Sequence, residues 1–294
     1  MKRILVTGAT GNVGEYVLRH LKARSYPFNA AVPDVEQAKA KMGPLFPFVE
    51  FDFERPETHA AALQDVDRLF LVRPAHLNNP RKEIFPFLHA AQEAGVKQVV
   101  FLSLIGAQHN PLSPHRKIEQ HLEKMGMPYT FLRASFFMQN LTTFHKGEIE
   151  EGQLFIPAGQ HHTALIDARD IAEVATVSLI QPGHEYKAYD LTGPEALDYQ
   201  QVADVLSSTL GRRIQHIDPS FPEWVRHWKG RGASWEHIMT LTAIYTTARL
   251  GFGSKPREDL SNVLGRPAVS FERFAAEHRS SWAIKREGSL SAST

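Results

Sequence analysis

Three glycines near the start of the chain have the spacing of a phosphate-binding turn. Gly8, Gly11 and Gly14 follow an apolar run at 4–6 and precede a helical pattern of apolar residues. In such a unit the free N–H groups and the positive dipole end of the helix point at a diphosphate. Gly8 permits the turn, Gly11 lets the backbone approach the phosphates, and Gly14 lets the helix pack against the strand. The residues expected to bind the diphosphate of a dinucleotide are Gly8, Thr10, Gly11, Asn12, Val13 and Gly14.

A carboxylate stands where a dinucleotide fold contacts the adenosine ribose. Asp34 closes the second expected strand, 20 residues beyond Gly14 (34 − 14), which is the usual distance for this contact. A carboxylate there accepts hydrogen bonds from a free 2′-hydroxyl and repels a 2′-phosphate, so it favours NAD over NADP. Asp34 is equally suited to cap the next helix, and Lys39 and Lys41 could partly compensate for a missing phosphate anchor.

Strands and helices alternate along the first half of the chain. Strands are expected at 4–6, 29–32, 48–51, 67–72 and 95–103, with helices from 12 and at 35–42, 57–63 and 80–95 between them. This order with short links is the signature of a Rossmann-type α/β fold, a doubly wound parallel sheet. Ligands of such sheets bind beyond the carboxyl ends of the strands, where the strand order reverses. The other candidate cofactor residues at these ends are Asp52, Phe53, Arg73, Pro74, Ala75 and Ser103.

The remainder is expected to form a smaller mixed α/β lobe. The dinucleotide-binding core takes residues 1–150 and regains 163–192, the lobe takes 151–162 and 193–284, and 285–294 reads as a flexible tail. Elements expected in the lobe are helices at 199–210, 221–229, 235–250, 260–264 and 271–282 and a strand at 213–217. Its aromatic residues could enclose a planar ligand or pack the lobe, and packing is the commoner outcome. The substrate is expected in the cleft between the lobe and the sheet.

Composition excludes several classes of function. The 294 residues carry 33 basic and 32 acidic side chains, a balance that argues against nucleic acid as a partner. The chain has no cysteine, which excludes disulfides, thiol nucleophiles and zinc–thiolate sites. The histidines show no metal-ligand spacing, so we expect no metal. We also expect no flavin. No run resembles a signal peptide or a membrane span, and a cytoplasmic protein without a membrane partner is expected.

The proton-transfer pair of typical short-chain dehydrogenases is missing. These enzymes use Tyr-x-x-x-Lys on the helix after the fifth strand, where lysine lowers the pKa of the tyrosine. None of the seven tyrosines has a lysine four residues later, and the helix expected at 113–125 contains no tyrosine. The typical mechanism is therefore absent.

Four segments carry a family resemblance that spans nearly the whole chain. They are 115–123, 126–140 with its Gly-x-x-Tyr-Thr-x-x-Arg pattern, 165–175 with Asp-x-x-Asp-Ile-Ala, and the closing helix at 267–278. Together with Thr-Gly-x-x-Gly-x-x-Gly at the start, they resemble the NmrA-like family of atypical short-chain dehydrogenase/reductases. Only the part around 221–265 does not resemble the family.

The resemblance implies roles for individual residues. In relatives an arginine that holds the NADP phosphate stands where this chain has Pro33, which also favours NAD. Asp52 matches the residue that meets the adenine amino group, and Phe53 the neighbour that packs the ring. The backbone of Arg73, Pro74 and Ala75 would border the ribose and nicotinamide, and Phe136 belongs to a segment that roofs the nicotinamide.

Two candidate catalytic residues follow from the same resemblance. His115 and Lys117 lie at or beside the catalytic lysine of plant reductases of the family. Either could touch the nicotinamide ribose or protonate a reduced substrate, since imidazole titrates near neutral pH. Alternatively, both lie on a solvated helix face, where Glu119 pairs with His115 at i,i+4.

The family includes NAD(P)H-dependent quinone, azo-dye and triphenylmethane-dye reductases, phenylpropanoid reductases, and non-catalytic redox-sensing regulators. We expect a reductase that passes hydride from NAD(P)H, with a mild preference for NADH, to a small planar conjugated acceptor. The alternative is an NAD(P)-sensing regulator that acts on a protein partner without turnover. A sugar-nucleotide epimerase is a distant third, because it would need the Tyr–Lys pair.

Overall fold

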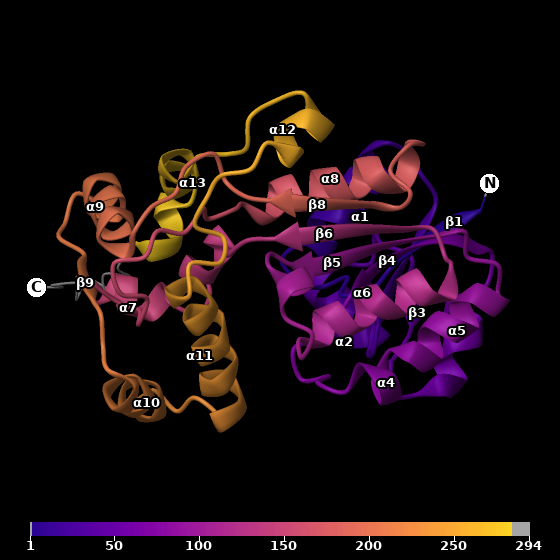
Figure 1. Ribbon diagram of the computed structural model, residues 1–294, viewed down its shortest axis with the longest axis horizontal. Coiled ribbons are helices and arrows are strands. Elements are labelled where there is room, and N and C mark those ends of the chain that lie inside the picture. Colours follow the sequence, from indigo (N-terminus) through magenta and orange to yellow (C-terminus); the bar gives the residue numbers. More distant parts are fainter. Residues whose placement is uncertain (1, 284–294) are drawn as a thin grey trace, which may run out of the picture.

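The computed structural model describes residues 2–283, so the tail expected at 285–294 lies outside the described residues. Figure 1 shows two parts side by side: a sheet flanked by helices, and a smaller lobe built mainly of helices. No helix in 2–283 is both long enough and apolar enough to cross a membrane.

Seven parallel strands form the central sheet, in the order β3-β2-β1-β4-β5-β6-β8. They are β1 (Arg3–Val6), β2 (Phe28–Val32), β3 (Phe48–Glu50), β4 (Val66–Val72), β5 (Gln98–Leu104), β6 (Tyr129–Ala134) and β8 (Lys187–Leu191). The chain winds outward to β3, returns to the middle at β4, and then winds the other way. The predicted doubly wound parallel sheet is confirmed, and its order reverses between β1 and β4.

Each face of the sheet is covered by helices over its own apolar core. Alternate residues of a strand point to opposite faces, so Ile4 of β1 enters one core and Leu5 the other. The first core holds α1 (Gly14–Ala23), α2 (Val35–Met42) and α8 (Ala168–Ile180). The second holds α3 (His59–Ala62), α5 (Phe85–Glu93) and α6 (Pro114–Met125), with α4 (Pro80–Glu83) packed beside α5 and α6.

Three expected helices differ clearly from the structure in their bounds. The helix expected at 271–282 ends at Glu277 and is followed by a 3-10 turn at Arg279–Trp282. The helix expected at 80–95 is interrupted at Ile84, which ends α4 and begins α5. Pro86 explains the break, because proline has no N–H to donate and its ring clashes with the carbonyl four residues earlier. The helix expected at 57–63 starts with a 3-10 turn, Pro56–Thr58, and only His59–Ala62 is α-helical.

The lobe combines a two-stranded parallel sheet with helices, as expected. β7 (Gln153–Phe155) pairs with β9 (Gln215–Ile217). Its helices are α7 (Lys146–Glu150), α9 (Tyr199–Leu210), α10 (Phe221–Gly230), α11 (Trp235–Arg249) and α13 (Phe271–Glu277), followed by a 3-10 turn at Arg279–Trp282. Although α12 (Asp259–Leu264) belongs to the same stretch of sequence, it packs against α8 and β8 of the sheet.

Most lobe aromatics pack the interior. Trp224, Trp228 and Tyr245 are buried in one cluster with ring centroids 5.6–5.7 Å apart. The packing interpretation is therefore confirmed for these three residues, whereas Trp235 is half exposed. The lobe therefore has an apolar core of its own.

Candidate functional site

The glycine turn lies at the reversal point of the sheet. Gly8 follows β1 with φ of +61°, in the left-handed region that favours glycine. A Cβ at Gly14 would lie 2.1 Å from the Gly8 carbonyl oxygen, so only glycine lets α1 approach the turn this closely. The Thr7 hydroxyl joins the carboxyl ends of β1 and β4, since it donates to the Phe70 carbonyl (3.1 Å) and accepts from the Val72 amide (2.8 Å). β1 and β4 are thereby held at fixed positions where a ligand would enter.

The first turn of α1 is suited to receive a diphosphate. Its N-cap is Val13, and among the described residues no side chain caps the helix. Gly11 and Asn12 are exposed in front of it. Uncapped N–H groups carry a partial positive charge that attracts anions. The residues present therefore fit the diphosphate of NAD(P), with the glycine turn as the cradle.

Asp34 is the N-cap of α2, as its second interpretation predicts. Its carboxylate accepts from the Gln37 amide (2.9 Å) and remains exposed, so a second acceptor oxygen is free for a ribose hydroxyl. Lys41 donates to the Thr10 carbonyl of the glycine turn (2.8 Å), whereas Lys39 pairs with Glu36. One carboxylate and one ammonium thus lie near the expected adenosine ribose.

The residues after β3 lie at the same edge but are packed inward. Asp52 accepts from the Glu54 amide (2.9 Å) and is half buried. Phe53 is buried against Phe51 and Phe87, with ring centroids 4.8 and 5.5 Å away. The structure places Phe53 in the core of the sheet, with little surface left to stack on an adenine.

Arg73 organises the loop after β4. Its guanidinium donates to the carbonyls of Pro74 (2.9 Å), Ala75 (3.1 Å) and Leu77 (2.6 Å). Burial lowers the pKa of Arg73, and its Nε is buried without a hydrogen-bond partner among the described residues. A fixed cation with a spare donor therefore faces the space beyond β4.

Ser103 belongs to a buried ion-pair network. Its hydroxyl donates to Glu119 Oε1 (2.7 Å), and the Arg133 guanidinium donates to both oxygens of the same carboxylate (2.9 and 3.0 Å). Arg116 completes the network at 3.1 Å. Glu119 is fully buried, which shows that the alternative of an exposed His115–Glu119 pair is wrong. The Arg of the Tyr-Thr-x-x-Arg motif thus holds α6 against β5 and β6.

His115 lies on the buried face of α6, where its ring stacks on Phe101 with centroids 5.9 Å apart. Burial, together with the charge of Arg73, lowers its pKa to about 3. The expectation that this imidazole titrates near neutral pH is wrong, because a cation there would be desolvated beside another cation. Nδ1 of His115 is buried and has no hydrogen-bond partner among the described residues.

A cavity of about 450 Å³ separates the sheet edge from the lobe. We call it the cleft cavity. His115 and Arg73 line it from the sheet side, with Ala75 and the loop after β5. The opposite wall is one face of α11, formed by Thr240, Ala243, Ile244 and Thr247 with Leu250 just beyond. Apolar side chains line both walls, Ile105 on the sheet side and Ile244 on α11, and polar groups such as Arg73 and His115 lie among them, the usual make-up of a small-molecule site.

Some of the predicted site residues do not line the cleft cavity. Lys117 is half buried on α6 and is not among the residues that line the cavity, and Phe136 lies beside Gly253 behind its rim. Sequence reasoning missed the α11 wall, whose four residues recur at i, i+3, i+4 and i+7, the spacing of one helix face. Among residues 2–283, no group of three or more His, Asp or Glu side chains is placed to hold a metal.

Comparisons with known proteins agree with this geometry. The model of the NmrA-like family matches residues 1–225. An NAD(P)H azoreductase of Xenophilus azovorans is 34% identical over 279 residues, which cover 94% of this chain and 97% of that protein. Prestalk A differentiation protein A of Dictyostelium discoideum is 32% identical over 278 residues, covering 93% and 91%.

A solved structure is similar over almost the same length. Triphenylmethane reductase of a Citrobacter species, complexed with NADP(H), superposes with a TM-score of 0.84 at 25% identity. The match covers 95% of this chain and 100% of that one. Both parts of the molecule, and therefore the cleft cavity between them, lie within the matched region.

Proposed function

The chain belongs to the NmrA-like family, and from this we propose that it is a reductase of planar conjugated acceptors such as azo or triphenylmethane dyes and quinones. It is an NAD(P)H-dependent oxidoreductase, as its azoreductase relative and the NADP(H)-bound dye reductase indicate. The observation that carries the proposal is the cleft cavity, in which Arg73 and His115 lie beside the ends of β4 and β5 and α11 forms the opposite wall.

NAD(P)H, when bound, supplies a hydride to the acceptor. The glycine turn and the α1 N-terminus would hold the diphosphate, and the loop fixed by Arg73 would border the rest of the cofactor. A quinone or azo acceptor gains negative charge with the hydride, and the guanidinium of Arg73 stabilises that charge, since a fixed cation in a poorly hydrated site needs no reorganisation. A cationic triphenylmethane dye becomes neutral when it takes up the hydride. Ala243 and Ile244 of α11 orient a flat ring.

The proton that completes the reduction of a quinone or azo acceptor comes from water, whereas a cationic triphenylmethane dye needs no proton. His115 is neutral at physiological pH because its pKa is about 3, so it acts as a hydrogen-bonding group and not as an acid. A dye or quinone accepts hydride without prior protonation, so the missing Tyr–Lys pair is tolerable. For the cofactor we propose a mild preference for NADH, because Asp34 disfavours a 2′-phosphate and Pro33 replaces the phosphate-binding arginine.

Fluorescence titration with NADH and NADPH, followed by nicotinamide absorbance with a panel of azo dyes and quinones, tests the proposal. We expect tight binding and acceptor-dependent oxidation. Gly11→Asp is the control, because its carboxylate would face the diphosphate and abolish both signals. A protein that binds neither nucleotide would refute the site.

Tight binding without oxidation of any acceptor would support a second candidate, an NAD(P)-sensing regulator that acts on a protein partner. One observation favours it: a relative 32% identical to this chain is named as a differentiation protein. The lowered pKa of His115, about 3, is compatible with either function.

A further inference from the structure

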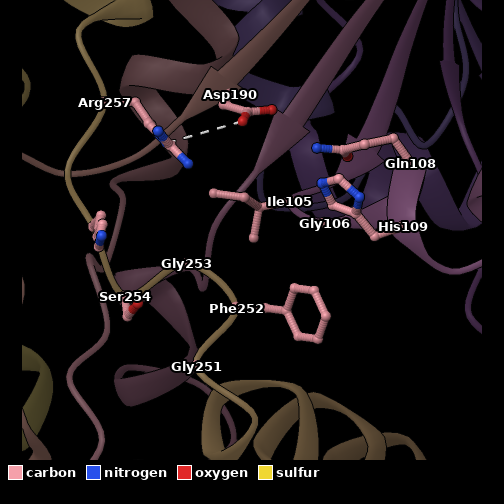
Figure 2. A pocket seen from close by; sticks show the side chains of 11 residues that line it. Ile105, Gly106, Gln108, His109, Asp190, Gly251, Phe252, Gly253, Ser254 and Arg257 are labelled. Carbon is pink, nitrogen blue, oxygen red and sulfur yellow. Dashed lines mark ion pairs between the residues drawn. The ribbon is translucent and has the colours of Figure 1, made fainter.

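A second cavity, of about 280 Å³, lies directly beside the cleft cavity. The two share Ile105, Gly106 and Phe252. One wall of the second cavity is the loop after β5, and the other is residues 251–257, which we call the strap. Figure 2 shows Ile105 and Phe252 pointing into this space, with Arg257 and Asp190 at the end opposite Phe252.

Glycines place Phe252 between the two cavities. Gly251 and Gly253 both have positive φ, +78° and +73°, a conformation that lets the strap turn on either side of the phenyl ring. The ring lies against Gly106, where an added Cβ would be 2.4 Å from its Cδ1. The Gly253 carbonyl accepts from the Ala164 amide (2.8 Å), which anchors the strap to the segment that leads into α8. A ligand in the cleft cavity can therefore reach the second cavity by passing one side chain.

The second cavity is lined by two cations and one carboxylate. Lys255 and Arg257 come from the strap, and Asp190 comes from β8. Arg257 Nε lies 4.0 Å from Asp190, whereas no carboxylate within residues 2–283 forms an ion pair with Lys255. Burial raises the pKa of Asp190, against the charges of Arg133 and Arg257. The lining therefore has a net positive charge of one with all three groups ionised, and a greater one when Asp190 is protonated.

One polar group without a hydrogen-bond partner lies on the opposite wall. Gln108 Oε1 is buried and has no hydrogen-bond partner among the described residues. Rotation of the amide by about 180° about its last side-chain torsion presents its N–H₂ donors at the same position. The ring of His109 stands beside Gln108 on this wall in Figure 2. An unsatisfied buried amide costs free energy unless a ligand or water pairs with it.

We propose that the second cavity binds an anionic substituent, a carboxylate or sulfonate, carried by the planar acceptor. This inference rests on the proposed function. About 280 Å³ is near the lower limit for a complete ligand site, which suits a charged substituent whose parent ring system lies in the cleft cavity. Lys255 and Arg257 bind the anion and the Gln108 amide donates to it, so the enzyme prefers acidic aromatic acceptors to neutral ones of the same size.

The test compares two related acceptors, 1,2-naphthoquinone and its 4-sulfonate, in the holoenzyme. Lys255→Gln/Arg257→Gln should raise the KM for the sulfonate about tenfold, the usual effect of losing charge-assisted hydrogen bonds, and leave the KM for the neutral quinone within about twofold. Arg249→Gln is the matched control, because Arg249 is exposed and lines neither cavity. Equal losses for both quinones, or no change for either, would overturn the proposal.

Binding of 2-naphthalenesulfonate, which cannot be reduced, separates this inference from the proposed function. Calorimetry with the protein–cofactor complex should give a Kd about tenfold weaker in the double variant, with 2-naphthol unaffected. If neither quinone is turned over but this difference persists, the anion subsite stands and the reductase proposal fails. If wild type and double variant bind the sulfonate equally, the subsite is refuted whatever the turnover.

Discussion

Replacing His115 should change how the stability of this protein depends on pH. Its pKa falls from 6.5 to about 3 because the ring is buried, with a smaller effect from Arg73. Below about pH 6.5 the unfolded chain binds a proton at this residue and the native chain does not, so protonation favours unfolding. The penalty grows as the pH falls from 6.5 and levels off near pH 3, where the native residue also protonates.

The magnitude follows from the two pKa values. Between about pH 7.5 and about pH 5, the unfolded-state protonation lowers the free energy of unfolding by about 2 kcal/mol. His115→Gln removes this contribution. The variant should therefore lose about 2 kcal/mol less than wild type over the same interval, whatever its absolute stability at neutral pH.

Urea unfolding at the two pH values, followed by tryptophan fluorescence, measures this difference. Comparing the change in the free energy of unfolding between the two pH values cancels the packing change that the substitution itself causes. His161→Gln, at an exposed position, is the control. Parallel pH dependence in wild type and His115→Gln would refute the reasoning, because it would mean that the buried imidazole titrates as a solvated one does. The proposal that His115 stays neutral during turnover would then also fall.

Three further predictions concern the glycine turn, the buried ion pair and the ribose contact. Gly14→Ala should destabilise the fold by about 1–3 kcal/mol and abolish NAD(P) binding, because its Cβ would meet the Gly8 carbonyl at 2.1 Å. A free energy of unfolding equal to that of wild type in urea titrations would contradict this. Arg133→Met should cost about 3–5 kcal/mol in urea unfolding, because Glu119 remains buried without its bidentate partner; adding Glu119→Met should recover most of it. Asp34→Asn keeps the α2 cap and removes the charge, so the ratio of NADPH to NADH affinity should rise roughly fivefold, or about 1 kcal/mol, in fluorescence titrations. An unchanged ratio would leave Asp34 as a cap only.

The sequence determined the sheet and the position of its binding edge. Buried parallel strands read as short apolar runs, and a glycine turn before a helical pattern is local information, so β1, the turn and α1 could be placed from residues 1–23. The same is true of Asp34, whose capping role follows from its place before a helix. Even the wrong bounds have local causes, such as Pro86, that the sequence shows.

The tertiary structure alone decided the environment of each candidate side chain. His115 on α6 is neutral because Phe101 of β5 covers its ring and Arg73, from the loop after β4, lies near it. The cleft cavity needs α11, more than a hundred residues after His115 along the chain, and the second cavity needs the strap and β8. Periodicity and turn chemistry depend on neighbours in sequence, so the sequence alone predicted the strands, helices and turns. Burial and electrostatics depend on every neighbour in space, so only the tertiary structure revealed them.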